Sequence, residues 1–135
     1  MAGVDGVELD DLFAECDVVT LHAPPRADGR PLVDATLLGS LRPQTVLVNT
    51  ARSALVDPEA VLAALEDGAL RAYAVDAFDQ EPPVLDALLS HPRVILTPHV
   101  GGYTDASVRR ATEQAVTNLI TALTADTAPA ARSLS

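Results

Sequence analysis

The sequence contains one cysteine and few aromatic residues, with no tryptophan, and these shortages limit its possible cross-links, metal sites and core. Cys16 is the only cysteine, so an internal disulfide and a cysteine-based metal site are excluded, and we interpret it as a small core residue on a helix. The core has to be aliphatic, because the aromatic residues are limited to Phe13, Tyr73, Phe78 and Tyr103. An aliphatic core is typical of parallel strands covered by helices.

Basic residues and long hydrophobic runs are also scarce. The chain has 9 Lys and Arg against 19 Asp and Glu, a formal net charge of −10 at pH 7. A surface this acidic repels phosphate backbones, so we predict no nucleic-acid partner. No run approaches the roughly 18 apolar residues of a membrane span, and the acidic N-terminal stretch does not resemble a signal peptide. We therefore expect a cytoplasmic protein without a membrane partner.

What the sequence does contain is a set of short apolar runs that alternate with helical patterns. The runs are rich in Val, Leu and Ile and predict strands buried on both faces, near 17–21, 45–48, 71–76 and 94–97. Apolar periodicity and capping residues predict helices over 9–16, over 34–40, from Asp57 to a stop at Gly68, and over 104–123. This alternation predicts an α/β fold, a parallel sheet with helices on both faces.

Chemically useful side chains follow the predicted strands. Arg52 comes after the second strand, Asp76 ends the third and His99 comes after the fourth, with Glu81 in the loop between the last two. Because the carboxyl ends of parallel strands meet at one edge of the sheet, we expect these residues to gather there. An arginine can bind the carboxylate of a 2-oxo acid through two hydrogen bonds. A histidine held by a carboxylate can exchange a proton with the substrate oxygen.

Each of these residues also has a simpler interpretation when it is taken alone. Arg52 could be a surface ion-pair partner, and Glu81 an ordinary loop acid. His22, at the end of the first strand, could belong to the site or could satisfy a loop carbonyl group, and His91 is typical of a surface loop. Taken alone, these residues leave both interpretations open.

Four motifs together resemble the D-isomer-specific 2-hydroxyacid dehydrogenases, a family that includes phosphoglycerate, glycerate/hydroxypyruvate, formate and D-lactate dehydrogenases. The motifs are LHAP at 21–24, VNTAR at 48–52, VDAF..EP at 75–82 and TPHVGG at 97–102. The resemblance runs from about Leu9 to Leu123 and keeps the order and spacing of all four. It implies a partial NAD-binding domain over 1–123. Residues 124–135 are small and polar, and we expect them to form a flexible C-terminal tail.

The resemblance also implies a role for individual residues. Arg52 would bind the substrate, His99 would be the acid–base residue and Glu81 would be its partner. The implied cofactor-binding residues are Ala23, Thr50, Ala51, Arg52, Asp76, His99, Val100, Gly101 and Gly102, with Asp76 beside the nicotinamide amide; no metal is implied. One departure is visible, because the family usually carries glycine where this chain has Ser53. If that position needs a positive φ, Ser53 adds strain of roughly 1 kcal/mol; otherwise it is harmless.

The sequence contains no G-x-G-x-x-G motif, the signature that binds the pyrophosphate in the family. The fold we expect is therefore a partial Rossmann-type parallel sheet flanked by helices, lacking the first two strands and the glycine-rich loop. Residues 3–9 would be a remnant of the third strand. The strand near 17–21 would have an open hydrogen-bonding edge, which is a template for aggregation.

The implied function is that of an NAD-dependent oxidoreductase that interconverts a D-2-hydroxy acid and a 2-oxo acid. NADP is left open as the cofactor, because the residues that distinguish the two dinucleotides would precede Met1. Intact members of the family form homodimers. We expect the 135 residues to be inactive by themselves. The alternative is a non-catalytic dinucleotide-fold remnant that acts as a protein-interaction module, as corepressor-like relatives of the family do.

Overall fold

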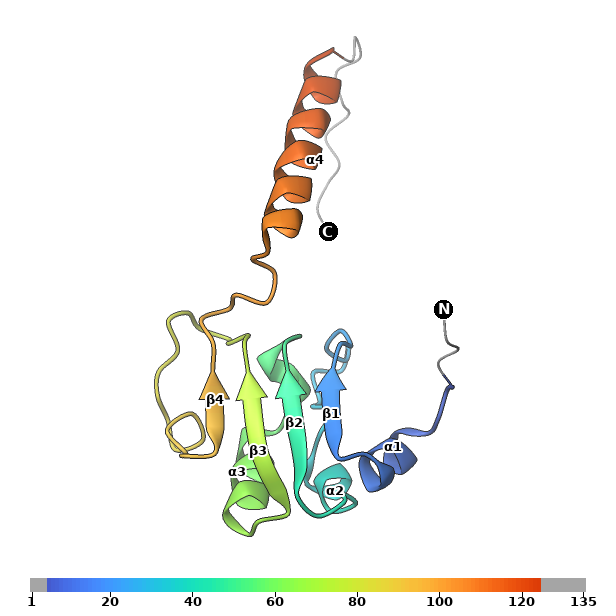
Figure 1. Ribbon diagram of the computed structural model, residues 1–135, viewed down its shortest axis with the longest axis vertical. Coiled ribbons are helices and arrows are strands. Elements are labelled where there is room, and N and C mark those ends of the chain that lie inside the picture. Colours follow the sequence, from blue (N-terminus) through green and yellow to red (C-terminus); the bar gives the residue numbers. More distant parts are fainter. Residues whose placement is uncertain (1–4, 125–135) are drawn as a thin grey trace. The chain divides into compact units, whose positions relative to one another are not determined.

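The computed structural model describes residues 5–124, which fall into two compact units divided between Val100 and Gly101. The first unit is a parallel sheet of strands β1 (Val18–Leu21), β2 (Thr45–Asn49), β3 (Leu70–Val75) and β4 (Val94–Leu96), in the order β1-β2-β3-β4 (Figure 1). It also holds helices α1 (Leu9–Glu15), α2 (Ala35–Leu38) and α3 (Pro58–Glu66). The predicted α/β class and parallel sheet are confirmed, and each strand lies within a residue or two of its predicted bounds.

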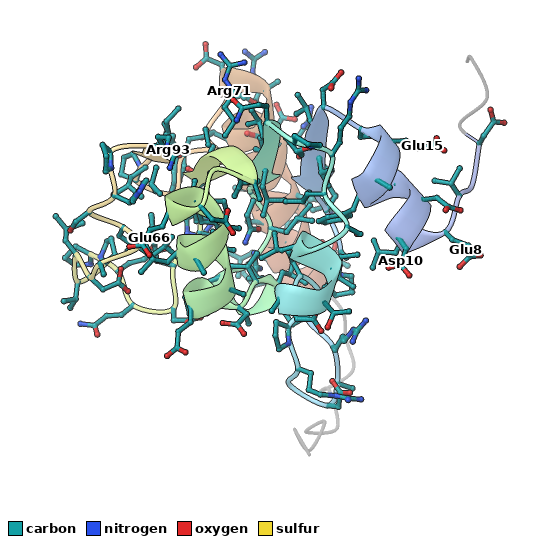
Figure 2. The ribbon with its side chains drawn as sticks, turned by 90° about the horizontal axis from the view of Figure 1, so that it is seen from below. Glu8, Asp10, Glu15, Glu66, Arg71 and Arg93 are labelled. Atoms are coloured by element: carbon teal, nitrogen blue, oxygen red, sulfur yellow. The ribbon has the colours of Figure 1, made fainter. Side chains whose placement is uncertain are left out.

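Helix α3 shows how local sequence sets an element. The carboxylate of Asp57 accepts hydrogen bonds from the backbone N–H groups of Glu59 and Ala60, at 3.0 and 3.3 Å, and proline occupies the first turn. After the helix, Gly68 adopts a φ of +82°, a conformation that glycine allows without strain. Arg93 donates from Nη2 to the carbonyl of Leu65 in the last turn (Figure 2). The helix therefore begins and ends where the sequence predicted.

Two smaller elements complete the helical layer. Asp34 caps α2 by accepting a hydrogen bond from the N–H of Leu37 at 3.0 Å. A 3-10 helix, η1 (Ser53–Leu55), follows β2 and was not predicted. It leads into Val56, which forms an isolated parallel bridge with Val33 and so holds the loop after β1 beside the start of α3.

The core of the first unit lies on one face of the sheet. Buried strand residues alternate with more exposed ones, and the buried set packs with Phe13 of α1, Leu37 of α2 and Leu65 of α3 in one cluster. On the opposite face, Val18 and Ile95 are 60% and 61% exposed. Within the first unit, the helices therefore cover one face of the sheet, and the expected burial of the second face stays a prediction. An unbroken apolar run shows that a strand is hydrophobic and does not say which face receives helices.

The second unit contains α4 (Asp105–Thr124), the long helix predicted from Thr104. No residue of α4 is buried, and its apolar stripe, which includes Val116 and Leu119, is exposed. Within residues 5–124, no helix is long and apolar enough to cross a membrane.

Two expectations for the ends of the chain have different outcomes. The strand remnant expected over 3–9 is wrong for the residues that are described, because 5–8 have no regular structure and α1 starts at Leu9. Asp5 and Gly6 have low strand propensity, and no neighbouring strand pairs with this stretch among residues 5–124. Of the tail predicted over 124–135, Thr124 is the last residue of α4 and the rest lies outside the described residues.

Candidate active site

All four strands run in the same direction, so their carboxyl ends share one edge of the sheet (Figure 1). Arg52 follows β2, Asp76 follows β3 and His99 follows β4 within three residues of each strand's end. Glu81 lies in the loop between β3 and β4. The sheet topology therefore provides the edge at which the sequence predicted these residues to gather.

Asn49, the last residue of β2, organises the turn that carries Arg52. Its side-chain Oδ1 accepts hydrogen bonds from the N–H groups of Ala51 and Arg52, at 3.1 and 3.2 Å, and its Nδ2 donates to the Arg52 carbonyl at 2.7 Å. Asn49 is fully buried, whereas the Arg52 side chain is exposed and donates from Nη1 to the Ala51 carbonyl. Sequence reasoning missed this role. An Asn two or three residues before a turn is the signal that could have shown it.

Tyr73 of β3 lies beneath the same turn. The Nδ2 of Asn49 donates to the Tyr73 hydroxyl at 3.4 Å, and the tyrosine is 1% exposed. Burial raises the pKa of Tyr73 to about 12, because the phenolate would lose its hydration, and the contact with Asn49 opposes this only in part. The phenol is therefore neutral at physiological pH and serves as packing and support for the turn.

Glu81 and His99 form the central contact of the site. The Oε1 of Glu81 lies 2.5 Å from Nδ1 of His99, and both side chains are 45% exposed. His99 has a φ of +53°, and its N–H donates to the carbonyl of Thr97 at 2.9 Å. A non-glycine residue in this left-handed region costs of order 1 kcal/mol and is commonest at functional sites. With Nδ1 paired to the carboxylate, Nε2 is the ring nitrogen that a substrate can use.

Asp76 fastens the end of β3 to the turn that carries His99. Its Oδ1 accepts hydrogen bonds from the Thr97 hydroxyl at 2.5 Å and from the Val100 N–H at 2.8 Å, and the residue is 4% exposed. Its own N–H donates to the carbonyl of Asn49. Thr97 is a second supporting residue that sequence reasoning missed. The contact of Asp76 with a nicotinamide amide stays a prediction.

The other predicted cofactor residues differ in their surroundings. Ala23 is half-buried against the core, and Thr50 is exposed at the turn. Val100 is 45% exposed at the end of the first unit, whereas Gly101 and Gly102 belong to the second. His22, exposed after β1, lies with its Nε2 3.0 Å from the Thr20 hydroxyl, so its partner is a side chain and not the loop carbonyl that we considered.

Ser53, where the family usually has glycine, is not strained. Among the described non-glycine residues only Gln44 and His99 have positive φ. Ser53 instead begins η1, and its hydroxyl donates a hydrogen bond to the carboxylate of Asp79. The serine is therefore compatible with the backbone of this turn and adds a contact that glycine cannot make.

A parallel sheet with polar side chains collected at its carboxyl edge defines the class of open α/β domains that bind ligands at this edge. The family model described as "D-isomer specific 2-hydroxyacid dehydrogenase, NAD binding domain" matches residues 1–101. The chain belongs to this family, and the matched part is its NAD-binding domain.

Individual relatives agree with the family assignment. The chain is 36% identical to the D-specific alpha-keto acid dehydrogenase of Enterococcus faecalis over 130 residues, which cover 86% of this chain and 40% of the relative. The crystal structure of a D-lactate dehydrogenase from Treponema pallidum matches with a TM-score of 0.80 and 30% identity, covering 93% and 41% of the two chains. A D-lactate dehydrogenase from Aquifex aeolicus, complexed with NAD and lactic acid, matches with a TM-score of 0.76 and 27% identity, covering 89% and 41%. The chain thus spans about two fifths of the length of these relatives.

Proposed function

We propose that this chain carries the acid–base and substrate-binding residues of an NAD-dependent, cytoplasmic oxidoreductase that interconverts a D-2-hydroxy acid and a 2-oxo acid. The observation that carries the proposal is the contact between Glu81 and His99 at the carboxyl edge of the sheet. We further propose that the 135 residues are inactive by themselves, because the sequence has no glycine-rich pyrophosphate motif.

The chemistry of the exposed groups supports this reaction. The guanidinium of Arg52 can grip the substrate carboxylate through two parallel hydrogen bonds and polarise the neighbouring carbonyl. His99 donates a proton from Nε2 to the carbonyl oxygen in the reduction and accepts it in the oxidation. Glu81, on Nδ1, fixes the orientation and the tautomer of the ring. NAD, when bound, supplies and receives the hydride.

The residues of the carboxyl edge fit the nicotinamide end of such a cofactor. Thr50, directly after β2, and Val100, shortly after β4, are both exposed at this edge, so a ligand can reach these two positions. The carboxylate of Glu81 is paired with His99, and the exposed guanidinium of Arg52, after β2, is the positive charge that we propose for the carboxylate of the substrate. NADP stays open as an alternative to NAD.

The test is to join the chain to the complete upstream half of a family member and to follow 2-oxo acid reduction by the consumption of NADH. We expect His99→Ala to lower kcat by about 10²–10⁴-fold, the usual contribution of a general acid. Arg52→Lys should lower kcat/KM by roughly 10- to 100-fold, because a charged hydrogen bond is lost.

His91→Ala is the matched control, since His91 precedes β4 and so lies at the opposite edge of the sheet. It should leave the rate nearly unchanged. Full activity in the His99→Ala protein would refute the assigned role. A fusion that binds NADH and reduces no 2-oxo acid would instead favour the alternative, a protein-interaction module.

A further inference from the structure

Only two hydrogen bonds tie residues 79–85 to the rest of the described chain. One joins Asp79 to the hydroxyl of Ser53, and the other joins Glu81 to His99. Ala77, before this segment, and Leu88, after it, are buried in the first unit. Between these two anchors most side chains are exposed, including Val84 at 72% and Leu85 at 63%. Burial therefore holds the ends of the segment and not its middle.

A cavity also lies against this segment. Its volume is about 560 Å³, and its lining includes Ser53, Asp79 and Val84 together with Phe78 and the start of α3. Close packing against α3 is therefore absent on this side of the segment. The position of Glu81 has to be set by hydrogen bonds rather than by the fit of apolar side chains.

The bond between Ser53 and Asp79 joins two functional parts of the sequence. Ser53 directly follows Arg52, and Asp79 precedes Glu81 by two residues. The contact therefore couples the turn that presents the arginine to the loop that presents the partner of His99. Asn49 holds the first of these parts rigidly through its three hydrogen bonds to Ala51 and Arg52.

We propose that Ser53 is a positioning residue, which holds the Glu81 loop through Asp79 so that the Glu81 carboxylate meets Nδ1 of His99. This inference rests on the proposed function for its meaning in catalysis. The hydroxyl does not touch the substrate or the cofactor in this scheme; it raises the fraction of molecules in which Glu81 and His99 are paired. Asp79 accepts this hydrogen bond and is the second positioning residue.

The test uses the 135-residue chain labelled with nitrogen-15 and reads the ring nitrogen shifts of neutral His99, which report its two tautomers. Pairing with Glu81 favours the proton on Nδ1, so Glu81→Ala, which removes the acceptor, sets the signature of a lost pair. Ser53→Ala should shift the tautomer ratio roughly fivefold toward that signature, the factor expected for one hydrogen bond. Ser53→Gly, which introduces the glycine usual in the family, should shift the tautomer ratio in the same way. Ser53→Thr keeps a hydroxyl and should restore the wild-type ratio.

Asp79→Ala and the double variant with Ser53→Ala complete a mutant cycle. If Ser53 and Asp79 act only through the hydrogen bond between them, the double variant gives the same His99 tautomer ratio as either single variant. Ser90→Ala, an exposed serine beyond the cavity, is the control and should leave the ratio unchanged. A wild-type ratio in both Ser53→Ala and Ser53→Gly, or additive effects in the cycle, would overturn the proposal. Neither result depends on enzymatic turnover, so failure of the proposed reaction remains a separate outcome.

Discussion

At the scale of single residues, the support of the site is more deeply buried than the site itself. Asn49 and Asp76 are 0% and 4% exposed, whereas Glu81 and His99 are each 45% exposed in their side chains. The buried residues satisfy backbone groups of the turns that carry Arg52 and His99. Unpaired buried amides cost about 1–3 kcal/mol each, so these side chains stabilise the turns as well as shaping them.

Tyr73 gives a prediction for the pH dependence of stability. Its folded pKa of about 12 lies above the ordinary value of 10. The contribution of Tyr73 to the free energy of unfolding is therefore fully present below pH 10, where the phenol is protonated in both the folded and the unfolded chain. It is lost as the pH rises from 10 to 12, because only the unfolded chain ionises in this range. Two pKa units correspond to about 2–3 kcal/mol. Urea unfolding just below pH 10 and just below pH 12 measures this loss of unfolding free energy. The Tyr73→Phe variant should not show the loss.

Tyr103 provides the matched control, since it is 76% exposed. Tyr103→Phe should unfold with the pH dependence of the unchanged chain. If Tyr73→Phe loses as much stability over this range as the unchanged chain does, burial of the phenol is not the cause.

At the scale of elements, the helices and the strands depend on different information. Asp34 and Asp57 cap α2 and α3 through contacts that span at most three residues. The strands pair in parallel across 21 residues or more of chain, as Tyr73 with Val94 and Val18 with Val46 do. Capping therefore sets a helix from its own neighbourhood, whereas a strand needs partners brought in by the rest of the fold.

Strand β1 leads to a prediction of self-association. Within residues 5–124 it pairs only with β2, and Val18 on it is 60% exposed. An uncovered apolar edge strand is a template for pairing with another chain, and a lysine on such a strand opposes it. We expect the 135-residue chain to show association that grows with concentration in sedimentation velocity, and Val18→Lys to reduce it.

Val116→Lys is the control for charge, because it adds the same lysine to the exposed face of α4. If this variant dissociates the complexes and Val18→Lys does not, the apolar stripe of α4 makes the contact and the edge of β1 does not.

At the scale of the whole molecule, the proposed cofactor residues would account for one end of a dinucleotide only. They are proposed for the nicotinamide end, and the sequence has no G-x-G-x-x-G for the pyrophosphate. A helix N-terminus that binds phosphate supplies several charge-assisted hydrogen bonds of about 1.5–3 kcal/mol each. We therefore expect the chain alone to bind NADH at least about a hundredfold more weakly than its fusion with an upstream half.

Isothermal titration calorimetry of both proteins with NADH tests this expectation. His99→Ala in the fusion should change the affinity little, because the role proposed for His99 is on the substrate oxygen. A micromolar dissociation constant for the 135 residues by themselves would show that the carboxyl edge binds the cofactor without the missing motif.

The sequence by itself determined the class of the fold and the edge on which the site lies. Val-, Leu- and Ile-rich runs predicted each strand, and Asp57, Pro58 and Gly68 predicted the bounds of α3, because periodicity and capping act over a few residues. The parallel alternation then placed Arg52 and His99 at the same edge without any knowledge of contacts.

Only the tertiary structure decided which side chains meet and which face of the sheet is covered. Glu81 meets His99 across 18 residues, and Ser53 meets Asp79 across 26. A loop of that length has many conformations, and these two hydrogen bonds select among them, whereas the burial of Ala77 and Leu88 holds only its ends. The face on which the helices of the first unit pack could not be predicted either, because an apolar strand is equally hydrophobic whether helices pack on one face or on both.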